Sequence, residues 1–506
     1  MLESIQLKRS KVLQVLRKYM SFIGPGLVVS VSYMDPGNYQ TSVSSGSMFE
    51  YKLLIVIFMS NLFAIILQIL CVKLGTVTGL DLAEMCRLHL NPKVNLFMYI
   101  CAEIAIIATD LAEVVGTAIA LEILFGIPLL YGVLITVLDV LIILMAYRKD
   151  GTMKQTRFFE IFVSILVAAT CVCFVTELFK CDFPPGTGWQ IFKGFLPVND
   201  VVFTDSTALF LSCGIVGSTV MPHSLYLGSS LVQPRLKEYD ENHDKEVVEV
   251  DDDERLFPPN TPRLRRLSDS SFLARKYKPS YAAIKYCLHY SYFELVLSLF
   301  TVAVFVNSAI LIVAGSSLFG QPDAADADLL SIYKMLSYYI SPAAGLVFAL
   351  SMLFAGQSAG IVCTMAGQII SEGFINWNMK PWKRRIITRV LAIVPVVIVI
   401  GILGREGVSK VMNSSQVVLS FILPIVSGPL IYFTCSKEYM TVYETSSQAT
   451  ESTSLLENDV HSNSSSPCRY TFENGKFLRT ASILTWVIIS FLNIYLVIAF
   501  ANGAQI

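Results

Sequence analysis

Apolar segments long enough to cross a bilayer make up most of this 506-residue chain. With 54% hydrophobic and 15% charged residues, the chain has too few polar side chains to cover these segments in water. Helices satisfy their own backbone hydrogen bonds in lipid, so we expect an all-α polytopic membrane protein. The predicted spans are eleven, at residues 19–47, 53–75, 95–124, 127–146, 157–178, 205–232, 287–316, 343–370, 387–404, 411–435 and 480–501.

Basic residues gather in the connections that fall on one side of these spans. Lys and Arg are concentrated in residues 1–18, between the fourth and fifth spans, and between the eighth and ninth. Connections with many basic residues stay in the cytosol. Residues 1–18 are therefore predicted to be a cytosolic tail, and no cleavable signal peptide precedes the first span.

Two long polar inserts interrupt the apolar pattern, and both fall on the predicted cytosolic side. Residues 234–280 are dense in charge, and residues 437–475 are rich in Ser, Thr, Glu and Asn. Neither insert has enough apolar residues to bury a core, so we expect two flexible loops.

Each insert contains one short motif of a regulatory kind. Ser268 follows a run of arginines, a pattern read by basophilic kinases, and Glu451 with Leu455 and Leu456 fits the acidic dileucine pattern read by sorting adaptors. Such short patterns also occur by chance. The dileucine pattern favours a vacuolar or endosomal membrane, with the plasma membrane as the second choice.

The first span is interrupted near its middle by Asp35-Pro-Gly-Asn38. The proline removes a backbone donor and clashes with the preceding turn, so we expect the helix to break. A break at membrane depth is tolerated where the freed backbone lines a cavity. Asp35 and Asn38 would then offer oxygens to a cation. The alternative is a simple proline kink with a hydrogen-bonded Asp35.

The sixth span has a matching interruption at Met221-Pro-His223. Interrupted helices at corresponding positions of two halves indicate inverted repeats with a site near the midplane. Spans one to five and six to ten are expected to form the two repeats of a LeuT-like 5+5 architecture, with the eleventh span appended, at residues 19–178, 205–435 and 480–501.

Asp35, Asn38 and Met221 together combine two hard oxygens with one soft thioether. A thioether contributes little to binding Ca²⁺ or Mg²⁺, which prefer oxygen ligands. It suits Mn²⁺, Fe²⁺, Co²⁺ and Cd²⁺ better. Alone, Met221 would be read as a core residue; beside a second broken helix, we interpret it as a metal ligand.

The third span carries Glu103, Asp110 and Glu113 on one helical face. Carboxylates inside a membrane need a positive partner, water or a proton. The arginines of the ninth span, including Arg389, could pair with them, and His223 is a nearby titratable group. A proton route and a static salt-bridge network are both open for Glu103, whereas Asp110 favours proton transfer.

These motifs resemble the Nramp family, the natural resistance-associated macrophage proteins, which are proton-coupled divalent metal transporters. The resemblance covers nearly the whole membrane region and looks most like the fungal branch. It is carried by Gly24-Pro-Gly26, Asp35-Pro-Gly-Asn38, Gly79-Leu-Asp-Leu-Ala-Glu84, Glu103-Ile-Ala-Ile-Ile-Ala-Thr-Asp110, Leu111-Ala-Glu113, Met221-Pro-His223, Ala366-Gly-Gln368, Glu372-Gly-Phe374, Thr388-Arg389 and Leu419-Ser-Phe-Ile-Leu-Pro424.

The resemblance implies a set of metal ligands in this chain. Asp35, Asn38 and Met221 match the family's ligands, and the backbone carbonyl of Ser218 stands where the family usually has an alanine carbonyl. Gln416 matches a glutamine that approaches the metal in occluded states.

The resemblance also implies that Asp110 accepts the proton, with Glu113, His223 and Arg389 along the route. Two departures bear on proton coupling more than on the metal class. Gly228 stands where many relatives have a second histidine, and residues 356–364 differ from the usual Thr- and Gly-rich form.

We therefore expect a proton-coupled symporter that moves Mn²⁺ or Fe²⁺ into the cytosol. The alternatives are an organic-cation or amino-acid symporter of the same fold, and a membrane sensor that binds metal without transporting it. No catalytic motif or cofactor is expected. With a net charge of −1, no nucleic-acid partner is expected either.

Overall fold

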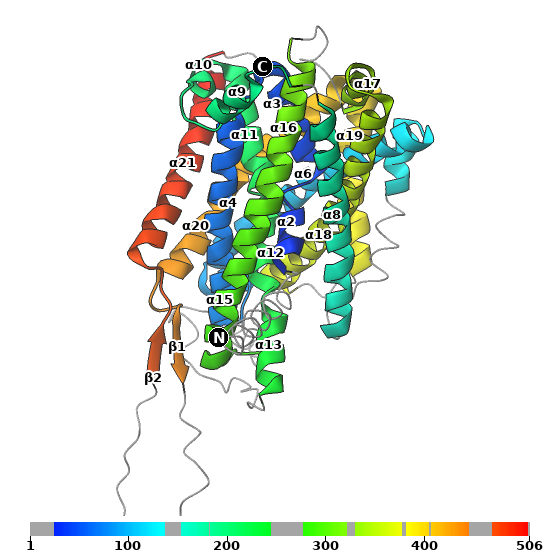
Figure 1. The fold of residues 1–506 in the computed structure, drawn as a ribbon. Helices are drawn as coiled ribbons and strands as arrows, with labels where there is room; N and C mark the ends of the chain where they lie inside the picture. The colour runs from blue at the N-terminus through cyan, green and yellow to red at the C-terminus, as the bar shows by residue number, and fades with distance from the viewer. Residues whose placement is uncertain are drawn as a thin grey trace, which may run out of the picture.

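The computed structural model describes residues 25–136, 153–181, 183–243, 277–320, 329–376, 381–403, 406–444 and 468–503. These form a bundle of long helices that run in roughly one direction, with a short hairpin at one end (Figure 1). The elements are α2 (Pro25–Val31), α3 (Pro36–Phe49), α4 (Leu54–Thr78), α5 (Leu82–His89), α6 (Pro92–Phe125), α8 (Met153–Lys180), α9 (Thr187–Gly194), α10 (Val201–Thr204), α11 (Ser206–Thr219), α12 (Pro222–Ser230), α13 (Gln233–Asn242), α15 (Tyr281–Ser298), the π-helical turn η2 (Leu299–Ala303), α16 (Val304–Leu318), α17 (Leu329–Tyr339), α18 (Pro342–Ile375), α19 (Pro381–Leu403), α20 (Glu406–Cys435), β1 (Thr441–Glu444), β2 (Cys468–Thr471) and α21 (Lys476–Ala501).

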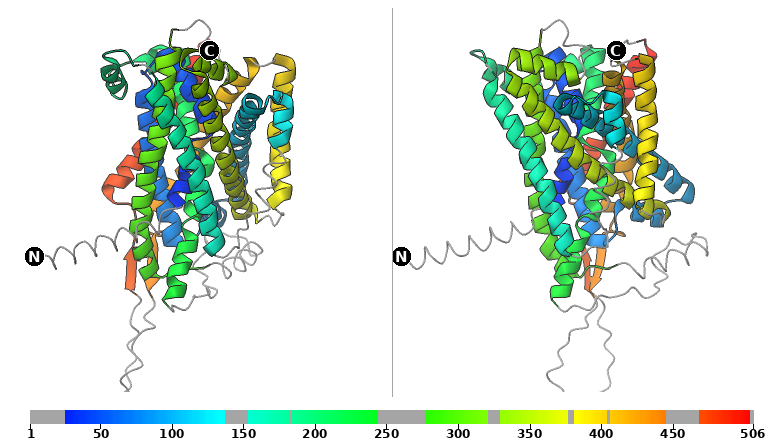
Figure 2. Two further views of the ribbon diagram at one scale, coloured as in Figure 1. Left: turned by 45° about the vertical axis from the view of Figure 1, so that its right-hand side comes forward. Right: turned by 90° about the vertical axis from the view of Figure 1, so that its right-hand side faces the viewer.

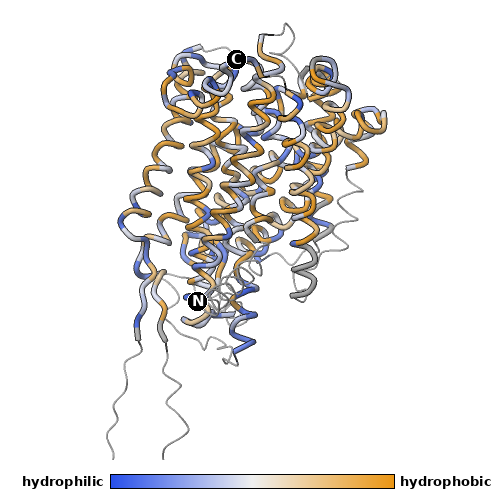
Figure 3. Tube along the Cα trace, viewed as in Figure 1, coloured by the Kyte–Doolittle hydropathy of each residue, from blue (hydrophilic) through white to orange (hydrophobic). Residues whose placement is uncertain are grey.

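Eight helices of the described residues are long and apolar enough to cross a membrane. Apolar residues fill the middle of the bundle, and polar residues gather toward its ends (Figure 3). Of the other predicted spans, the first is divided between α2 and α3, and the ninth corresponds to α19. The fourth is described only as far as residue 136. The described helices therefore follow the predicted order of spans.

The elements beside both polar inserts lie at the same end of the bundle. Helix α13 and the strands β1 and β2 project from this end, and α9, α10 and α17 lie at the opposite one (Figures 1 and 2). We call the first the hairpin end. It is the end that the distribution of basic residues assigns to the cytosol.

The first insert begins with structure where we expected a flexible loop. Helix α13 continues the polypeptide beyond the sixth span, and Leu236 on it is fully buried with Ala283 of α15. Asp240 accepts hydrogen bonds from the backbone nitrogen of Ser280 at 2.9 Å and from its hydroxyl at 2.6 Å. The prediction of a flexible loop over 234–280 was therefore wrong at both ends of the insert. There, burial of Leu236 and the hydrogen bonds of Asp240 hold the polypeptide in place.

The second insert also differs from the prediction at its two ends. Strands β1 and β2 pair in antiparallel register, and the ring of Tyr470 stacks on Tyr281 of α15 with centroids 3.9 Å apart. Asn474 donates from Nδ2 to the hydroxyl of Thr434 at 3.0 Å and accepts from Nζ of Lys73 at 2.9 Å. The ends of the insert are thus bound to α4, α15 and α20.

Several predicted features fall outside the described residues. These are the tail at residues 1–18, the phosphorylation candidate Ser268, and the dileucine pattern of Glu451, Leu455 and Leu456. Their sequence-based interpretation stays a prediction.

Close helix packing places the interrupted first span at the centre of the bundle. Helix α3 packs along α16 and against α11, and α6 packs along α18. A side chain on Gly116 of α6 would collide with Pro36, the first residue of α3. One on Gly217 of α11 would collide with the backbone of Gln416 on α20. Glycine at these two positions lets the backbones approach closely enough to bring the interrupted helices together.

Candidate metal site

The break in the first span is made by an aspartate cap. Helix α2 ends at Val31, and α3 begins at Pro36. Asp35 accepts at Oδ1 from the backbone nitrogen of Asn38 (3.0 Å) and at Oδ2 from that of Gly37 (3.2 Å). An aspartate N-cap followed by proline is a strong start signal for a helix. The predicted helix break is confirmed, and Asp35 is fully buried at it.

The sixth span also breaks before a proline, here without a side-chain cap. Helix α11 ends at Thr219, and α12 begins at Pro222, with Met221 in extended backbone between them. Met221 is fully buried, and its carbonyl accepts from the hydroxyl of Ser224 at 2.7 Å. The last carbonyls of α11 have no further turn of helix to bond, so they are available to a ligand.

The two breaks meet at the side chain of Asn38. Its Nδ2 donates to Oδ1 of Asp35 at 2.7 Å and to the carbonyl oxygen of Ser218 at 2.8 Å. A third element, α20, brings the Gln416 side chain to the same place. A methyl group on Gly37 would collide with the Gln416 amide and would lie 2.9 Å from Oδ2 of Asp35. The Gln416 amide and the Asp35 carboxylate therefore both lie against Gly37.

Four of the five predicted ligands are thus gathered at one place: Asp35, Asn38, Ser218 and Gln416. Gln416 is fully buried, and its Oε1 has no hydrogen-bond partner among the described residues. Met221 lies three residues after Ser218, at the start of the adjoining half-helix. Three or more oxygens with one sulfur nearby form a donor set that suits a divalent transition metal.

A polar network that the sequence did not indicate lies behind Met221. Gln68 donates from Nε2 to the hydroxyls of Tyr33 and Ser224, each at 3.0 Å. Ser224 in turn holds the carbonyl of Met221. The signal available in the sequence was Gln68 itself, one of a few polar residues within a mainly apolar second span. This network positions the break in the sixth span from the second span.

The carboxylates of the third span face the ninth span, as predicted. Glu103 accepts from Nη2 of Arg384 at 2.6 Å, and Glu113 lies 3.6 Å from Nη2 of Arg389. Arg389 also donates from Nη1 to the backbone carbonyl of Asp110 at 3.3 Å. The predicted stripe therefore pairs with arginines of the ninth span, and Arg389 links the Glu113 carboxylate to the backbone of Asp110.

His223 connects the sixth span to the third. Its Nδ1 lies 3.5 Å from the hydroxyl of Thr109, the residue before Asp110. One oxygen each of Asp110 and Glu113 and the sulfur of Cys363 lie within 4.8 Å of one another. Since Arg389 supplies positive charge to this group, we interpret it as part of an ion-paired network and not as a second metal site.

Comparison with known proteins identifies the family. A family model described as "Natural resistance-associated macrophage protein-like" matches residues 26–454. The chain belongs to the Nramp family. The resemblance seen in the sequence motifs is thereby confirmed, and the family consists of transporters and not enzymes.

Individual Nramp relatives resemble this chain over almost its whole length. The iron transporter SMF3 of Saccharomyces cerevisiae is 53% identical over 498 residues, which cover 98% of this chain and 99% of that protein. The crystal structure of a manganese transporter from Eremococcus coleocola has a TM-score of 0.72 at 28% identity, covering 97% of this chain and 90% of the other.

The structure of Mhp1, a nucleobase-cation-symport-1 transporter in a closed conformation, shares the fold. Its TM-score is 0.51 at 12% identity, and the match covers 81% of this chain and 78% of that one. The predicted LeuT-like membrane fold is confirmed. This Nramp chain is therefore an integral multi-pass membrane protein.

Proposed function

We propose that this protein is a proton-coupled symporter that moves divalent transition metal ions, Mn²⁺ or Fe²⁺, into the cytosol by alternating access. The observation that carries the proposal is the convergence of Asp35, Asn38 and the Ser218 carbonyl where two broken helices meet. The relatives support it, since one is named an iron transporter and another a manganese transporter.

The ligand set explains both affinity and selectivity. Asp35 provides the negative charge that a divalent ion requires on leaving water, and Asn38 and Ser218 provide neutral oxygens. The thioether of Met221 adds little for Ca²⁺ or Mg²⁺ and more for later transition metals. Gln416, on α20, is placed to complete the shell when the helices close on the ion.

The Asn38 amide bridges the two broken helices. Its NH₂ group lies between the carboxylate of Asp35 and the carbonyl of Ser218, two oxygens that would otherwise repel each other. To bind a metal, the amide must rotate so that Oδ1 faces the ion, and the ion then takes over the role of bridging the two oxygens. Metal binding and reorientation of Asn38 are therefore one event in this proposal.

The proton route is proposed to run along the third span beside the metal. Asp110 is fully buried next to Thr109, which contacts His223 on the half-helix that begins at Met221. Arg389 bonds the Asp110 backbone and pairs with Glu113. Asp110 is the proposed acceptor, with His223, Glu113 and Arg389 positioned to stabilise the charge that remains after proton transfer.

We place the transporter in a vacuolar or endosomal membrane, with the plasma membrane as the second choice. The support is the acidic dileucine pattern of Glu451, Leu455 and Leu456, which a cytosolic adaptor would read. An acidic lumen also supplies protons on the side from which such a symporter loads. Phosphorylation at Ser268 is a further proposal for the first insert.

Uptake into proteoliposomes tests the proposed function. Mn²⁺, Fe²⁺, Cd²⁺ and Ca²⁺ are compared with and without an inward proton gradient. We expect uptake of the first three, stimulation by the gradient, and exclusion of Ca²⁺. An uptake rate that does not depend on the proton gradient would refute proton coupling. Ca²⁺ entry at the rate of Mn²⁺ would refute the assigned ligand set.

A further inference from the structure

A buried glutamate lies apart from both the metal site and the ion pairs of the third span. Glu177 is on the last turns of α8 and is 1% exposed. Neither of its carboxyl oxygens has a hydrogen-bond partner among the described residues. A buried carboxyl group without a partner inside a membrane protein calls for a functional explanation.

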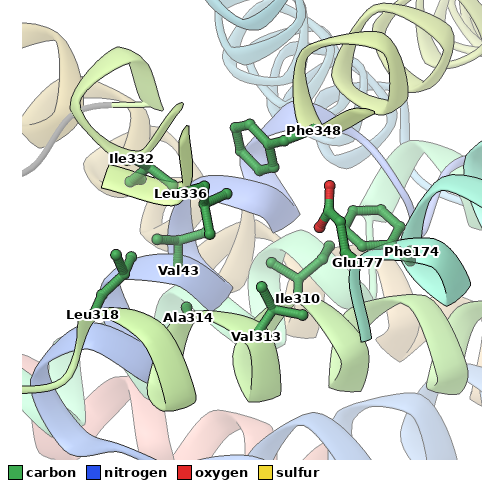
Figure 4. A pocket seen from close by; sticks show the side chains of 10 residues that line it. All are labelled: Val43, Phe174, Glu177, Ile310, Val313, Ala314, Leu318, Ile332, Leu336 and Phe348. Carbon is green, nitrogen blue, oxygen red and sulfur yellow. The ribbon is translucent and has the colours of Figure 1, made fainter. Parts of the chain in front are cut away.

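Among the described residues, the other side chains that line the cavity beside this carboxyl group are all apolar. Figure 4 shows it in the space between Phe174, Phe348 and Ile310. Helices α3, α8, α16, α17 and α18 line this pocket, which we call the Glu177 pocket. Its other lining residues are Val43, Val313, Ala314, Leu318, Ile332 and Leu336.

No cation compensates the carboxyl group within the described part of the Glu177 pocket. Among the described residues, Tyr39 on α3 and Cys173 on α8 itself are titratable side chains that interact electrostatically with Glu177. The lining residues from α16, α17 and α18 are all apolar. An ionised carboxylate in these surroundings loses its hydration without gaining a partner, whereas the neutral acid is far less costly to bury.

The size and chemistry of the pocket exclude larger ligands. The free space beside the carboxyl group has room for about one water molecule. A metal ion would need several oxygen, nitrogen or sulfur ligands, and these walls supply one carboxyl group. The ligand that fits is a proton, which needs no further coordination.

The Glu177 pocket is connected to the helix that carries the metal site. Tyr39 follows Asn38 directly, and its ring packs on Phe174 and Phe348 with centroid distances of 5.3 and 6.0 Å. Val43, one turn further along α3, lines the pocket. A tilt of α3 that opens a path to the metal site must therefore also disturb the packing around Glu177.

We propose that Glu177 is a second proton-binding site, which takes up a proton when this pocket closes and releases it when the pocket opens to water. The step forms one O–H bond on the carboxylate and takes the proton from water at the end of the bundle opposite the hairpin end. The closed arrangement is then favoured by protons on that side. This rests on the proposed transport function for its purpose, whereas the protonation itself is independent of transport.

Infrared spectroscopy of the full-length, metal-free protein in lipid nanodiscs tests the protonation. Wild type is compared with Glu177→Gln, an uncharged side chain of nearly the same shape. We expect the wild type to show a carboxylic-acid carbonyl band that the variant loses. The matched control is Glu122→Gln, at the end of α6 and only partly buried, which should keep the band. A spectrum unchanged by Glu177→Gln would overturn the proposal.

The pH profile of uptake tests the link to closure. Because the glutamine stays neutral at every pH, Glu177→Gln should flatten the dependence of Mn²⁺ uptake on the pH of the loading side and leave Mn²⁺ affinity unchanged. A lost infrared band with an unaltered pH profile would overturn the role in closure. If glutamine is not tolerated, Glu177→Asp should keep the band at a shifted frequency. Absence of uptake in the wild type would count against the transport proposal alone, since the band is read without metal.

Discussion

Replacing Asp35 with asparagine separates the structural role of this residue from its proposed role in metal binding. Asparagine caps helices nearly as well as aspartate, so the bond from the Asn38 nitrogen to Oδ1 is kept. The bond from Gly37 to Oδ2 is lost, which costs about 1 kcal/mol of stability. Metal binding loses the only formal charge among the proposed ligands. Removing one partner of a buried charge pair costs about 3–5 kcal/mol, or about 200-fold to several thousand-fold in affinity.

The assay combines three measurements on the same purified protein. Thermal stability in detergent should fall only slightly, Mn²⁺ affinity by calorimetry should fall by the factor above, and Mn²⁺ uptake into proteoliposomes should be abolished. The matched control is Asp205→Asn, which alters the exposed aspartate cap of α11 and should leave binding unchanged. A stable Asp35→Asn protein with wild-type affinity would refute the site assignment.

Four further predictions follow from the same contacts. Met221→Ala should raise Ca²⁺ uptake more than it lowers the rate of Mn²⁺ uptake, measured with both ions in competition. Continued exclusion of Ca²⁺ would show that the thioether does not determine selectivity. Asp110→Asn should keep metal binding and lose coupled proton influx, recorded as internal pH during uptake; undiminished influx would make Asp110 structural. Gly116→Ala should destabilise by about 1–3 kcal/mol through collision with the first-span proline, against Gly188→Ala as a control in open space, both by thermal unfolding. Alanine at both leucines of the dileucine pattern should move a fluorescently tagged protein to the cell surface, and an unchanged distribution would remove the sorting argument.

The membrane fold could be predicted because its signals are local in the sequence. Span length follows from the thickness of the bilayer, and the breaks follow from proline beside Asp35 and Met221. The ends of the inserts could not be predicted in this way. They are fixed by single long-range contacts, such as Asp240 with Ser280 and Asn474 with Lys73, within segments whose average composition is that of a loop.

The candidate site shows the same division. Asp35 and Asn38 could be assigned from their position within an apolar segment, and the Ser218 carbonyl from the family resemblance. The supporting network of Gln68 could not, because its partners come from two other spans. The burial of Glu177 could not be predicted from the sequence either. Close to the end of its span, it resembles a residue at the membrane surface, but the packing of α3, α16, α17 and α18 around it buries it.

The hairpin has a consequence for engineering the chain. Glu444 and Cys468 are partners across the two strands, so the segment between them starts and finishes at neighbouring points. The strands already hold the two ends of this segment together. Lengthening the segment raises the entropic cost of closing it by only about 0.6 kcal/mol for each doubling of its length. A fluorescent protein or purification domain whose own termini lie close together can be spliced between these residues with little strain on the helices. This position offers a place to attach a reporter while both ends of the protein keep their native sequence.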